Sequence, residues 1–512
     1  TQNPSAYNPV TYPESNEKRR KKVLNNMLKN GHITQAEYDE AIADDVYSRI
    51  QSINLETSTS SPYSYFVDEL IDEVLNDLMA QKGYTQTQAY NVLYSGGLSI
   101  YTTQDTTVQN ICDEEVNNPD NYPISTTYSV SCAWSVKKAD GTIQNYSDVD
   151  LDYYNRVVLE NPSFKLIFNT TEECDGLIEA FKQEYLKEGE TTIDENVEYT
   201  LQPQTSFTVM DQKTGYVKAI VGGRGEKTGS LTLNRATNTK RQPGSCFKVL
   251  SSYAPALDTA GYTLASTIVD EPFNDINGRP VSNWWKTGYR GVSTLREGIR
   301  DSMNIVTVKL LTAITPQLGF DYLQNFGFTT LVSNKTLNDG SVVSDVNQSL
   351  ALGGITYGVT NLELCASYAT IANGGVYTEP VLYTKVLDHN GKVILESTPS
   401  THTVIKESTA WLLTNAMEDV VTSGTGTACK VDGMTVAGKT GTTSNDYDLW
   451  FSGYTPYLTA TIWTGYDENA SLTNGSYHEY MWSKIVTRID EAKKYTEDIG
   501  FPMPDSVISA KI

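Results

Sequence analysis

Ser245 and Lys248 are the residues of this sequence whose types and spacing best fit nucleophilic chemistry. Their spacing of three residues places both side chains on one face if the segment is helical. A serine hydroxyl becomes a strong nucleophile only when a base removes its proton, and a lysine kept neutral by burial and by neighbouring cations can act as that base. The pair therefore predicts a nucleophilic serine that is activated by lysine.

The residues around this pair predict that Ser245 begins a helix. Pro243 and Gly244 form a turn before the serine, and an apolar face follows at Val249, Leu250, Tyr253 and Leu257. At a helix start, the helix dipole and the free backbone N–H groups favour a negatively charged oxygen. The two other Ser-x-x-Lys pairs, at residues 15–18 and 135–138, lie in polar runs. Only Ser245 has an apolar helix behind it.

A second candidate piece is Ser302-Met303-Asn304, which interrupts two apolar helical patterns. If the backbone is extended there, the side chains of Ser302 and Asn304 point the same way. In a cleft they would orient Lys248 and a substrate amide. A loop with capping residues explains the same pattern when it is considered alone.

The third candidate piece is Lys439, the only one of four Lys-Thr-Gly lysines that lies in a strand-like run. Strand periodicity puts Thr440 and Thr442 on one face and Lys439 on the other. We expect the two hydroxyls to hold a substrate carboxylate, and the ammonium of Lys439 to add charge at the base of the site. Gly441 lets the strand pass close to the serine helix. The backbone N–H groups of Thr442 and Ser245 would then form an oxyanion hole.

The elements that position these residues predict an α+β fold. A hairpin is expected at residues 207–221, and helices are expected at 361–373 and 407–422. Three strand-like runs close the segment, at residues 434–443, 450–454 and 458–466. This order implies one antiparallel sheet built from both ends of the segment, with helices packed against it.

We expect four parts along the chain. Residues 1–46 read as a small helical hairpin, in which Gly31 ends the first helix and a capping box at residues 34–37 begins the next. Residues 47–200 read as a small α+β linker or pedestal domain. The catalytic pieces lie in residues 201–485, and residues 486–512 read as a C-terminal appendage.

Within residues 47–200, two helical patterns at 63–94 and a strand at 96–103 precede an acidic insertion. The insertion, at about residues 118–200, shows short strand-like runs and one helix over residues 176–186. Its acidic residues are expected to form a solvated surface.

The composition excludes several classes of site. The chain has 512 residues, enough for two to four domains, and a net charge of -23 that is spread along its length. That charge argues against nucleic acid and anionic membrane surfaces as partners. The six cysteines show no C-x-x-C spacing and the four histidines lie far apart, so we expect buried thiols, no metal site and no cofactor. A serine enzyme of this sequence must use lysine as its base.

The three pieces resemble the Ser-x-x-Lys, Ser-x-Asn and Lys-Thr-Gly signature of the penicillin-binding protein and serine β-lactamase superfamily. Segments 241–245, 351–354, 437–443 and 450–456 are similar to the transpeptidase domain of class A, bifunctional penicillin-binding proteins. The resemblance covers about residues 200–490. It implies the superfamily's fold, an antiparallel sheet packed between helices.

The N-terminal residues are similar to the end of the family's peptidoglycan glycosyltransferase domain. The similarity rests on residues 3–9, Arg19-Arg20 and Val23-Leu24. The catalytic carboxylate motif of that domain is absent, and so is a membrane anchor. The resemblance therefore implies a bifunctional parent protein, of which this chain is a fragment that does not polymerise glycan.

The resemblance implies a two-step acyl transfer between peptidoglycan stem peptides. Ser245, deprotonated by Lys248, attacks the penultimate D-alanine carbonyl, and Ser302 relays a proton to the leaving D-alanine amine. An amine on a neighbouring stem peptide then resolves the acyl-enzyme and forms the cross-link. Asn304 would hold the peptide backbone, and Lys439, Thr440, Gly441 and Thr442 would form the carboxylate subsite.

The resemblance also implies partners and a location. β-Lactam antibiotics would acylate Ser245 as mimics of the donor and then stall, and other cell-wall synthesis proteins are further candidate partners. The full-length protein would be anchored at the extracytoplasmic face of a bacterial membrane. The chain begins at Thr1 and contains no apolar run of 18 residues, so we expect it to carry neither a signal peptide nor a membrane span.

Three alternatives remain open from the sequence. A β-lactamase needs a glutamate to activate water, and the nearest match, Glu379 in Glu379-Pro380-Val381-Leu382-Tyr383, lacks the expected asparagine. A D,D-carboxypeptidase would use water as the acceptor. A β-lactam sensor or scaffold would recruit partners through residues 47–200 without turnover.

Three neighbours of the motifs are expected to have packing roles. Cys246 is expected to point away from Lys248 into the core, and Trp284 and Trp285 are expected to pack against the core rather than line the groove.

Overall fold

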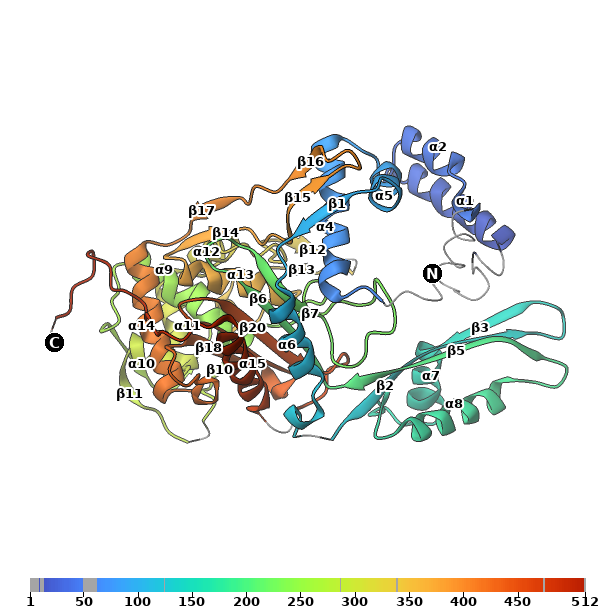
Figure 1. The fold of residues 1–512 in the computed structure, drawn as a ribbon. Helices are drawn as coiled ribbons and strands as arrows, with labels where there is room; N and C mark the ends of the chain where they lie inside the picture. The colour runs from blue at the N-terminus through green and yellow to red at the C-terminus, as the bar shows by residue number, and fades with distance from the viewer. Residues whose placement is uncertain are drawn as a thin grey trace. The chain divides into compact units, whose positions relative to one another are not determined.

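The computed structural model describes residues 9, 13–48, 62–123, 125–285, 287–337, 339–472 and 475–510. These residues divide into two compact units (Figure 1). The first comprises residues 1–62, 75–95 and 125–202, and the second comprises residues 63–74, 96–124 and 203–512. None of the described helices is both long enough and apolar enough to cross a lipid bilayer.

The second unit is built on a five-stranded antiparallel sheet in the order β18-β19-β20-β6-β7. Its strands are β6 (Gln204–Met210), β7 (Val217–Val221), β18 (Ala437–Thr442), β19 (Asp448–Tyr454) and β20 (Thr459–Gly465). Because β20 pairs with β6, the two ends of the segment meet inside one sheet. The predicted hairpin, the three closing strands and the α+β class are confirmed.

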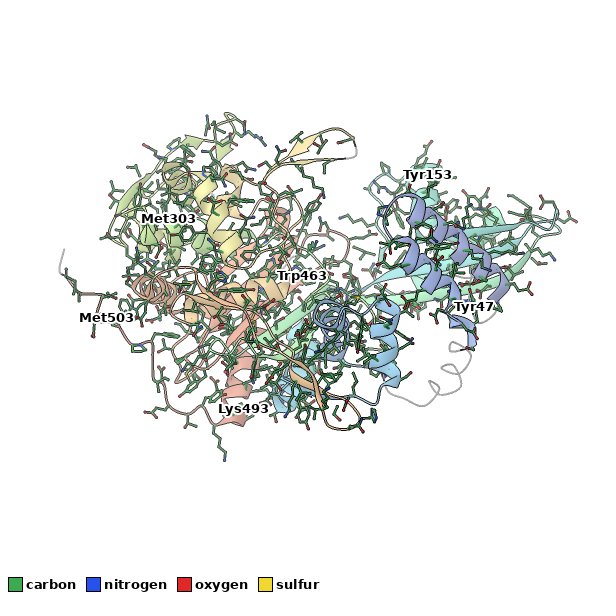
Figure 2. All side chains as sticks on the ribbon, turned by 90° about the horizontal axis from the view of Figure 1, so that it is seen from above. Tyr47, Tyr153, Met303, Trp463, Lys493 and Met503 are labelled. Carbon is green, nitrogen blue, oxygen red and sulfur yellow. The ribbon has the colours of Figure 1, made fainter. Side chains whose placement is uncertain are left out.

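Side chains of this sheet alternate between two hydrophobic cores. In β19, Trp450 and Tyr454 enter one core, whereas Leu449 and Phe451 enter the other. Both faces are therefore covered, and every residue of β19 and β20 is buried. Trp463 of β20 belongs to the first core together with Met303, and both are labelled in Figure 2.

Two pairs of helices complete these cores (Figure 1). The first core receives α13 (Asn361–Ala372) and α14 (Glu407–Ser423), which confirms the two helices predicted there. The second core receives α6 (Thr106–Asn117) and α15 (Tyr477–Lys493).

The closing helix α15 is part of the second core. It buries Met481, Trp482, Ile485, Val486 and Ile489, and the indole N–H of Trp482 donates to the carbonyl of Ala460 at 2.9 Å. The boundary predicted between residues 485 and 486 falls inside this helix.

Shorter elements surround the sheet. A three-stranded sheet of β1 (Ser99–Thr102), β15 (Tyr383–Leu387) and β16 (Val393–Glu396) confirms the strand predicted at residues 96–103. The remaining strand pairs are β8 (Thr267–Asp270) with β11 (Gly291–Thr294), β9 (Phe273–Asn274) with β10 (Pro280–Val281), β12 (Lys335–Thr336) with β13 (Val342–Val343), and β14 (Val376–Thr378) with β17 (Thr401–Thr403). Further helices and turns of this unit are η1 (Pro119–Asn121), α10 (Leu295–Arg300), α11 (Asn304–Ile314), α12 (Pro316–Asn325), η5 (Gln348–Leu352), η6 (Thr427–Cys429) and η7 (Ser444–Asp446).

The N-terminal helices agree with the sequence. α1 (Pro13–Lys29) and α2 (Gln35–Ala43) form the predicted hairpin, and Thr34 and Glu37 form the predicted capping box. Arg20 of α1 donates to the backbone carbonyl of Asp44 at 3.1 Å. The segment 3–9 lies outside the described residues except for Pro9. The two helices predicted at 63–94 are α4 (Tyr65–Lys82) and α5 (Gln86–Ser95).

Residues 125–202 form an α+β element with a core of its own. Its parts are β2 (Thr127–Lys137), β3 (Ile143–Ser147), α7 (Asp148–Tyr153), the π-helical η2 (Tyr154–Val158), β4 (Ile167–Phe168), α8 (Thr171–Tyr185) and β5 (Thr191–Gln202). The predicted α+β character and the helix predicted at residues 176–186 are confirmed, the helix as α8, but the prediction of short strands was wrong, because β2 and β5 are long and pair along their whole length. α8 starts before Gly176, since the Thr170 hydroxyl caps it by accepting from the backbone N–H of Glu173.

Candidate active site

Ser245 lies at the start of the predicted helical segment, but that segment is not a regular α-helix. The serine is in a 3₁₀ turn, η3 (Gly244–Cys246), which is followed by the π-helical η4 (Val249–Tyr253) and by α9 (Ala254–Asp258). Phe247 and Lys248 follow the 3₁₀ turn with right-handed helical backbone angles, and residues i and i+3 lie on the same side of both 3₁₀ and α-helical turns. Ser245 and Lys248 therefore still share one face.

Gly244 is required by the geometry of this turn. Its φ of 53° is left-handed, and a Cβ atom there would lie 2.6 Å from the carbonyl oxygen of Thr442. A larger residue would push the serine turn away from β18. Gly441 has the same role on the strand, because its Cβ would lie 2.5 Å from the carbonyl oxygen of Pro243. The close approach that the sequence predicted for Gly441 is confirmed.

Lys248 is fully buried and is held by the second motif. Its Nζ lies 2.6 Å from the carbonyl oxygen of Ser302, 2.6 Å from Oδ1 of Asn304 and 3.1 Å from Oγ of Ser302. Burial, together with the charge of Lys439, holds the pKa of Lys248 well below its usual range. A lysine of lowered pKa at this position can accept a proton.

Ser302 sits in the turn between α10 and α11 with a left-handed φ of 53°. The backbone is therefore not extended at this residue, and the condition under which the side chains of Ser302 and Asn304 would point the same way is not met. Asp301 supports the turn, because its carboxylate pairs with Arg300 at 2.7 Å and with Arg290. Strain of this kind costs about 1–2 kcal/mol and persists only where surrounding contacts enforce it.

Asn304 is the first residue of α11, and both ends of its amide are engaged. Oδ1 accepts from Lys248, and Nδ2 donates to the carbonyl of Ser282 at 2.7 Å. The helix start is capped from a distance, since Oδ1 of Asn283 accepts from the backbone N–H groups of Asn304 and Ile305. Asn283 carries no motif that sequence reasoning could have found.

Lys439 of β18 is also fully buried, and its long side chain brings its charge to Ser302. Its Nζ donates to Oγ of Ser302 at 2.9 Å and to the carbonyl of Thr440 at 3.1 Å. Burial lowers the pKa of Lys439 to about 8, although Cys246 and Glu479 act in the opposite direction. The Ser302 hydroxyl thus lies within hydrogen-bond distance of both lysines.

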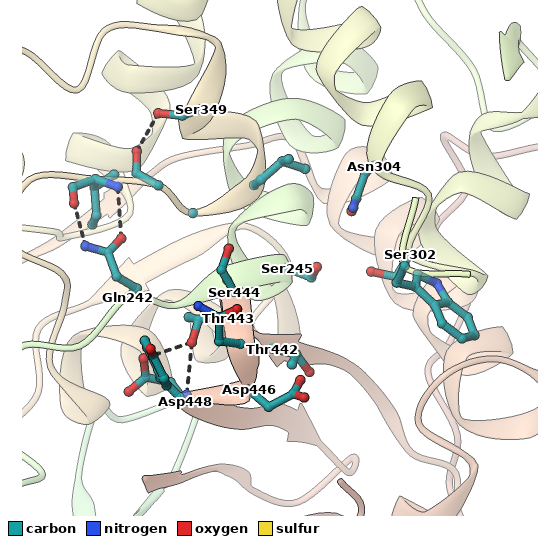
Figure 3. Close-up of a pocket in the computed structure, with 18 of the residues that line it drawn as sticks. Gln242, Ser245, Ser302, Asn304, Ser349, Thr442, Thr443, Ser444, Asp446 and Asp448 are labelled. Atoms are coloured by element: carbon teal, nitrogen blue, oxygen red, sulfur yellow. Dashed lines mark hydrogen bonds between the residues drawn. The ribbon is translucent and has the colours of Figure 1, made fainter. Parts of the chain in front are cut away.

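These residues surround one cleft with a volume of about 1270 Å³, which is shown in Figure 3. Ser245, Ser302, Asn304, Thr440 and Thr442 all line it. The structure therefore brings residues of all three sequence pieces to one place. Thr440 is fixed by a 2.8 Å hydrogen bond to the hydroxyl of Thr425, which also lines the cleft and which sequence reasoning did not single out.

Trp284 lines the cleft with 62% of its surface exposed, so its predicted packing against the core was wrong. Its indole N–H donates to the carbonyl of Asp301 at 2.8 Å, which holds it beside Ser302. Trp285 does pack against the core. Cys246 is buried in the core as predicted, and burial raises the pKa of its thiol to about 12. All six cysteines are free thiols, and all except the half-buried Cys132 are buried.

A network behind the serine turn uses residues for which no individual role was predicted from the sequence. Nε of Arg241 donates to Oδ1 of Asp448 at 2.7 Å, and the same oxygen accepts from the indole of Trp463 at 2.9 Å. Gln242 clamps the neighbouring loop, because its Oε1 accepts from the backbone N–H of Ile355 at 2.9 Å. These residues fix the turn that carries Ser245.

Glu379, the nearest candidate for a lactamase glutamate, is not among the described residues that line the cleft. Glu379 lies between β14 and β15, and its carboxylate accepts from the backbone N–H of Ser400. Glu479 of α15 does line the cleft, and burial raises its pKa to about 8.

Known proteins resemble this chain in sequence. The family described as Penicillin binding protein transpeptidase domain matches residues 205–485. Penicillin-binding protein 1A of Clostridium acetobutylicum is 32% identical over 522 residues, which cover 98% of this chain and 54% of the relative. Penicillin-binding protein 1A/1B of Bacillus subtilis is 27% identical over 535 residues, covering 100% of this chain and 47% of the relative. The chain spans about half the length of these curated relatives.

Solved structures share the fold. The PonA1 protein from Mycobacterium tuberculosis in complex with penicillin V aligns with a TM-score of 0.60 and 21% identity, over 86% of this chain and 96% of that one. Penicillin-binding protein 1A from Haemophilus influenzae aligns with a TM-score of 0.59 and 20% identity, over 99% of this chain and 80% of that one. From the family match, the motifs and the shared fold, we conclude that the chain belongs to the penicillin-binding protein transpeptidase family.

Proposed function

We propose that this chain is a serine D,D-transpeptidase that cross-links peptidoglycan stem peptides through an acyl-enzyme on Ser245. The observation that carries the proposal is the position of Lys248. A buried lysine of lowered pKa shares a face with Ser245 and contacts both Ser302 and Asn304. Such an arrangement provides a base for the serine and a route for its proton.

In the first step, neutral Lys248 is the base. Its two N–H groups are used by the 2.6 Å contacts to the Ser302 carbonyl and to Asn304, which leaves the nitrogen lone pair for the proton of Ser245. Oγ of Ser245 forms a bond to the penultimate D-alanine carbonyl carbon. The carbonyl oxygen becomes an oxyanion, which the backbone N–H groups of Ser245 and Thr442 stabilise.

The oxyanion then collapses and the carbon–nitrogen bond to the terminal D-alanine breaks. The leaving nitrogen takes up the proton that Lys248 removed, and Ser302 relays it, since its hydroxyl lies within hydrogen-bond distance of both lysines. In the second step, an acceptor amine attacks the ester carbon, loses a proton to the same relay, and the bond to Oγ of Ser245 breaks. The serine recovers its proton and the peptide bond is complete.

The donor carboxylate is proposed to bind at Thr440 and Thr442, with Gly441 between them and the charge of Lys439 below. Asn304 is proposed to contact the peptide backbone. A β-lactam would acylate the same serine and stall, because its leaving nitrogen stays attached to the acyl group. No metal and no cofactor takes part in these steps.

The direct test of function is turnover of a peptide that ends in D-Ala-D-Ala in the presence of an amine acceptor. The proposal predicts a cross-linked product and its loss in Ser245→Ala. Release of D-alanine without cross-linked product would indicate a carboxypeptidase. Labelling by a fluorescent penicillin without any peptide turnover would indicate a sensor or scaffold.

The whole protein is proposed to be larger than this chain and to act at the extracytoplasmic face of a bacterial membrane. In this proposal, residues 1–46 end a peptidoglycan glycosyltransferase domain and residues 47–200 link it to the transpeptidase domain at 201–485, which residues 486–512 follow. The parent protein would polymerise glycan as well as cross-link it, alongside other cell-wall synthesis proteins.

A further inference from the structure

The side chains that line the cleft include carboxyl groups and no basic groups among the described residues. No lysine, arginine or histidine is among the described residues that line it, whereas Asp345, Asp446, Asp448 and Glu479 are. The two lysines of the site, Lys248 and Lys439, are fully buried, and both contact the hydroxyl of Ser302. A cationic ligand would therefore meet carboxyl groups before it met either lysine.

Three of the four carboxyl groups are engaged by the protein or uncharged. Asp345 accepts hydrogen bonds from the backbone N–H groups of Val332 and Thr356 at 2.8 and 2.7 Å. Asp448 pairs with Arg241 at 2.7 Å. Glu479 is 6% exposed, and because burial raises its pKa to about 8, it is largely uncharged at neutral pH.

Asp446 differs from the other three. It is exposed, and within the described part of the chain its carboxylate has neither a hydrogen bond nor an ion pair. Figure 3 shows its side chain in the cleft, on the same side as Thr442 and with no dashed interaction. Asp446 is therefore the free negative charge of the cleft.

The backbone holds Asp446 in place. Asn445 and Asp446 have left-handed φ values of 61° and 55°. The backbone N–H of Asp446 donates to the carbonyl of Thr443 at 3.1 Å, and its own carbonyl accepts from the N–H of Leu472 at 3.0 Å. A carboxylate on a fixed turn is a pre-organised binding group.

The second half-reaction indicates which ligand would bind at Asp446. The first half-reaction expels an amine from the carbonyl carbon, and the second adds an amine to the same carbon. The attacking amine must therefore approach from the position that the leaving amine vacated. The leaving D-alanine lies at the Thr440 and Thr442 end of the cleft in the proposed function. An acceptor amine, which is an ammonium ion in solution, approaches this end over the buried charge of Lys439 and needs a counter-charge.

We propose that Asp446 binds the ammonium group of the acceptor and so favours cationic amines over water in the second half-reaction. The inference rests on the proposed transpeptidase function and names the acceptor's chemical class. Asp446 then determines specificity without taking part in bond formation. The bound ammonium releases one proton to solvent to become the neutral amine, and on attack a second proton passes through Ser302 to Oγ of Ser245. Asp446 acts by raising the local concentration of the acceptor.

The test compares two nucleophiles on the acyl-enzyme of a D-Ala-D-Ala peptide donor. Glycinamide is cationic at neutral pH, whereas hydroxylamine is uncharged. Asp446→Asn keeps the left-handed turn, since asparagine tolerates that conformation. We expect it to raise the KM for glycinamide about 3- to 10-fold, without changing the saturating rate and without changing the KM for hydroxylamine.

Salt and a matched variant complete the experiment. Sodium chloride at about 0.5 M should shrink the difference between wild type and Asp446→Asn, because salt screens an exposed charge. Asp432→Asn removes an exposed aspartate that is not among the described cleft residues, and it should behave as wild type. Penicillin labelling of each variant shows that its site is assembled.

Two results would overturn the inference. One is an Asp446→Asn variant that is acylated and keeps the wild-type KM for glycinamide. The other is an equal loss for glycinamide and hydroxylamine, which would indicate a structural effect. A wild-type protein that neither the donor nor penicillin acylates would instead overturn the proposed function, and this inference with it.

Discussion

The two active-site lysines are equally buried, yet the proposed reaction needs them in opposite charge states. Lys248 must be neutral to take the proton of Ser245, and its pKa is held well below the usual range by burial and by Lys439. Lys439 must be charged to attract a carboxylate, and burial lowers its pKa to about 8. Acylation by benzylpenicillin should therefore slow as the pH falls through the pKa of Lys248 and again as it rises through about 8. The second-order rate constant measured against pH tests this.

The Lys439→Arg variant separates the acidic and alkaline limbs of this profile of acylation rate against pH. The guanidinium does not titrate in the accessible range, so the alkaline limb should disappear while the acidic limb remains. An alkaline limb that persists near pH 8 in this variant would contradict the assignment to Lys439.

Ser302 has a strained backbone and a hydroxyl with a proposed role in catalysis. Its φ of 53° is unfavourable for any residue with a Cβ, so Ser302→Gly should be more stable than Ser302→Ala by about 1 kcal/mol. Both variants remove the hydroxyl that contacts Lys248 and Lys439, and both should lose about 10²- to 10⁴-fold in acylation rate. Denaturant unfolding and penicillin acylation measure the two effects. Ser302→Ala at least as stable as Ser302→Gly would show that the turn is not strained.

At the residue scale, the sequence predicts residues that belong to one short motif with a characteristic spacing. It does not predict residues that contact the site from elsewhere in the chain. Ser245 and Lys248 share a face whether the turn is 3₁₀ or α, so their pairing is robust. Asn283 caps α11 from outside that helix, and Asp301 holds Ser302 through two arginines. Neither of these interactions has a signature in the local sequence. The prediction for Trp284 was wrong because an aromatic pair is typical of a core, whereas a single hydrogen bond to Asp301 keeps this indole in the cleft.

At the scale of elements, the site depends on how closely the serine turn and β18 approach. A Cβ on Gly441 would lie 2.5 Å from the carbonyl oxygen of Pro243 and 2.8 Å from the sulfur of Cys246. Gly441→Ala should therefore destabilise the protein by about 1–3 kcal/mol and strongly reduce penicillin labelling, as overpacking does. Thermal unfolding and labelling rates check both effects.

Gly176→Ala is the matched control for this prediction. Gly176 lies inside α8, and no atom lies within 4 Å of the position that a Cβ would occupy there. Alanine at this position should raise stability by about 0.5–1 kcal/mol and leave labelling unchanged. Equal behaviour of the two alanine variants would show that the close approach at Gly441 is unimportant.

Elements with a strong hydrophobic pattern are predictable from the sequence. Elements whose conformation depends on pairing with another strand are not. The strands β19 and β20 are buried on both faces, and their aromatic and β-branched residues indicate strands. β5 is exposed along most of its length, so its polar sequence carries no strand signal, and its conformation comes from pairing with β2. The π-helical turn η4 likewise cannot be predicted from hydrophobic periodicity, because its sequence is as apolar as that of a buried α-helix.

At the scale of the whole molecule, residues 125–202 should be dispensable for acylation. Their hydrophobic core draws only on residues 130–197, and Thr127 pairs with Gln202, so the segment leaves and rejoins the chain at one place. Replacing residues 127–202 with a short glycine-rich linker should keep the rate of penicillin acylation within about threefold. A folded variant that loses labelling would show that this element supports the site.

The central claim is that Ser245 is the nucleophile of a penicillin-binding transpeptidase. The most direct measurement is the intact mass of the protein after incubation with benzylpenicillin, followed over hours, with the modified peptide then sequenced. The account predicts a long-lived adduct of one penicillin on Ser245 and none in Ser245→Ala. An adduct on another residue, an adduct lost rapidly as the drug is consumed, or no adduct would contradict it.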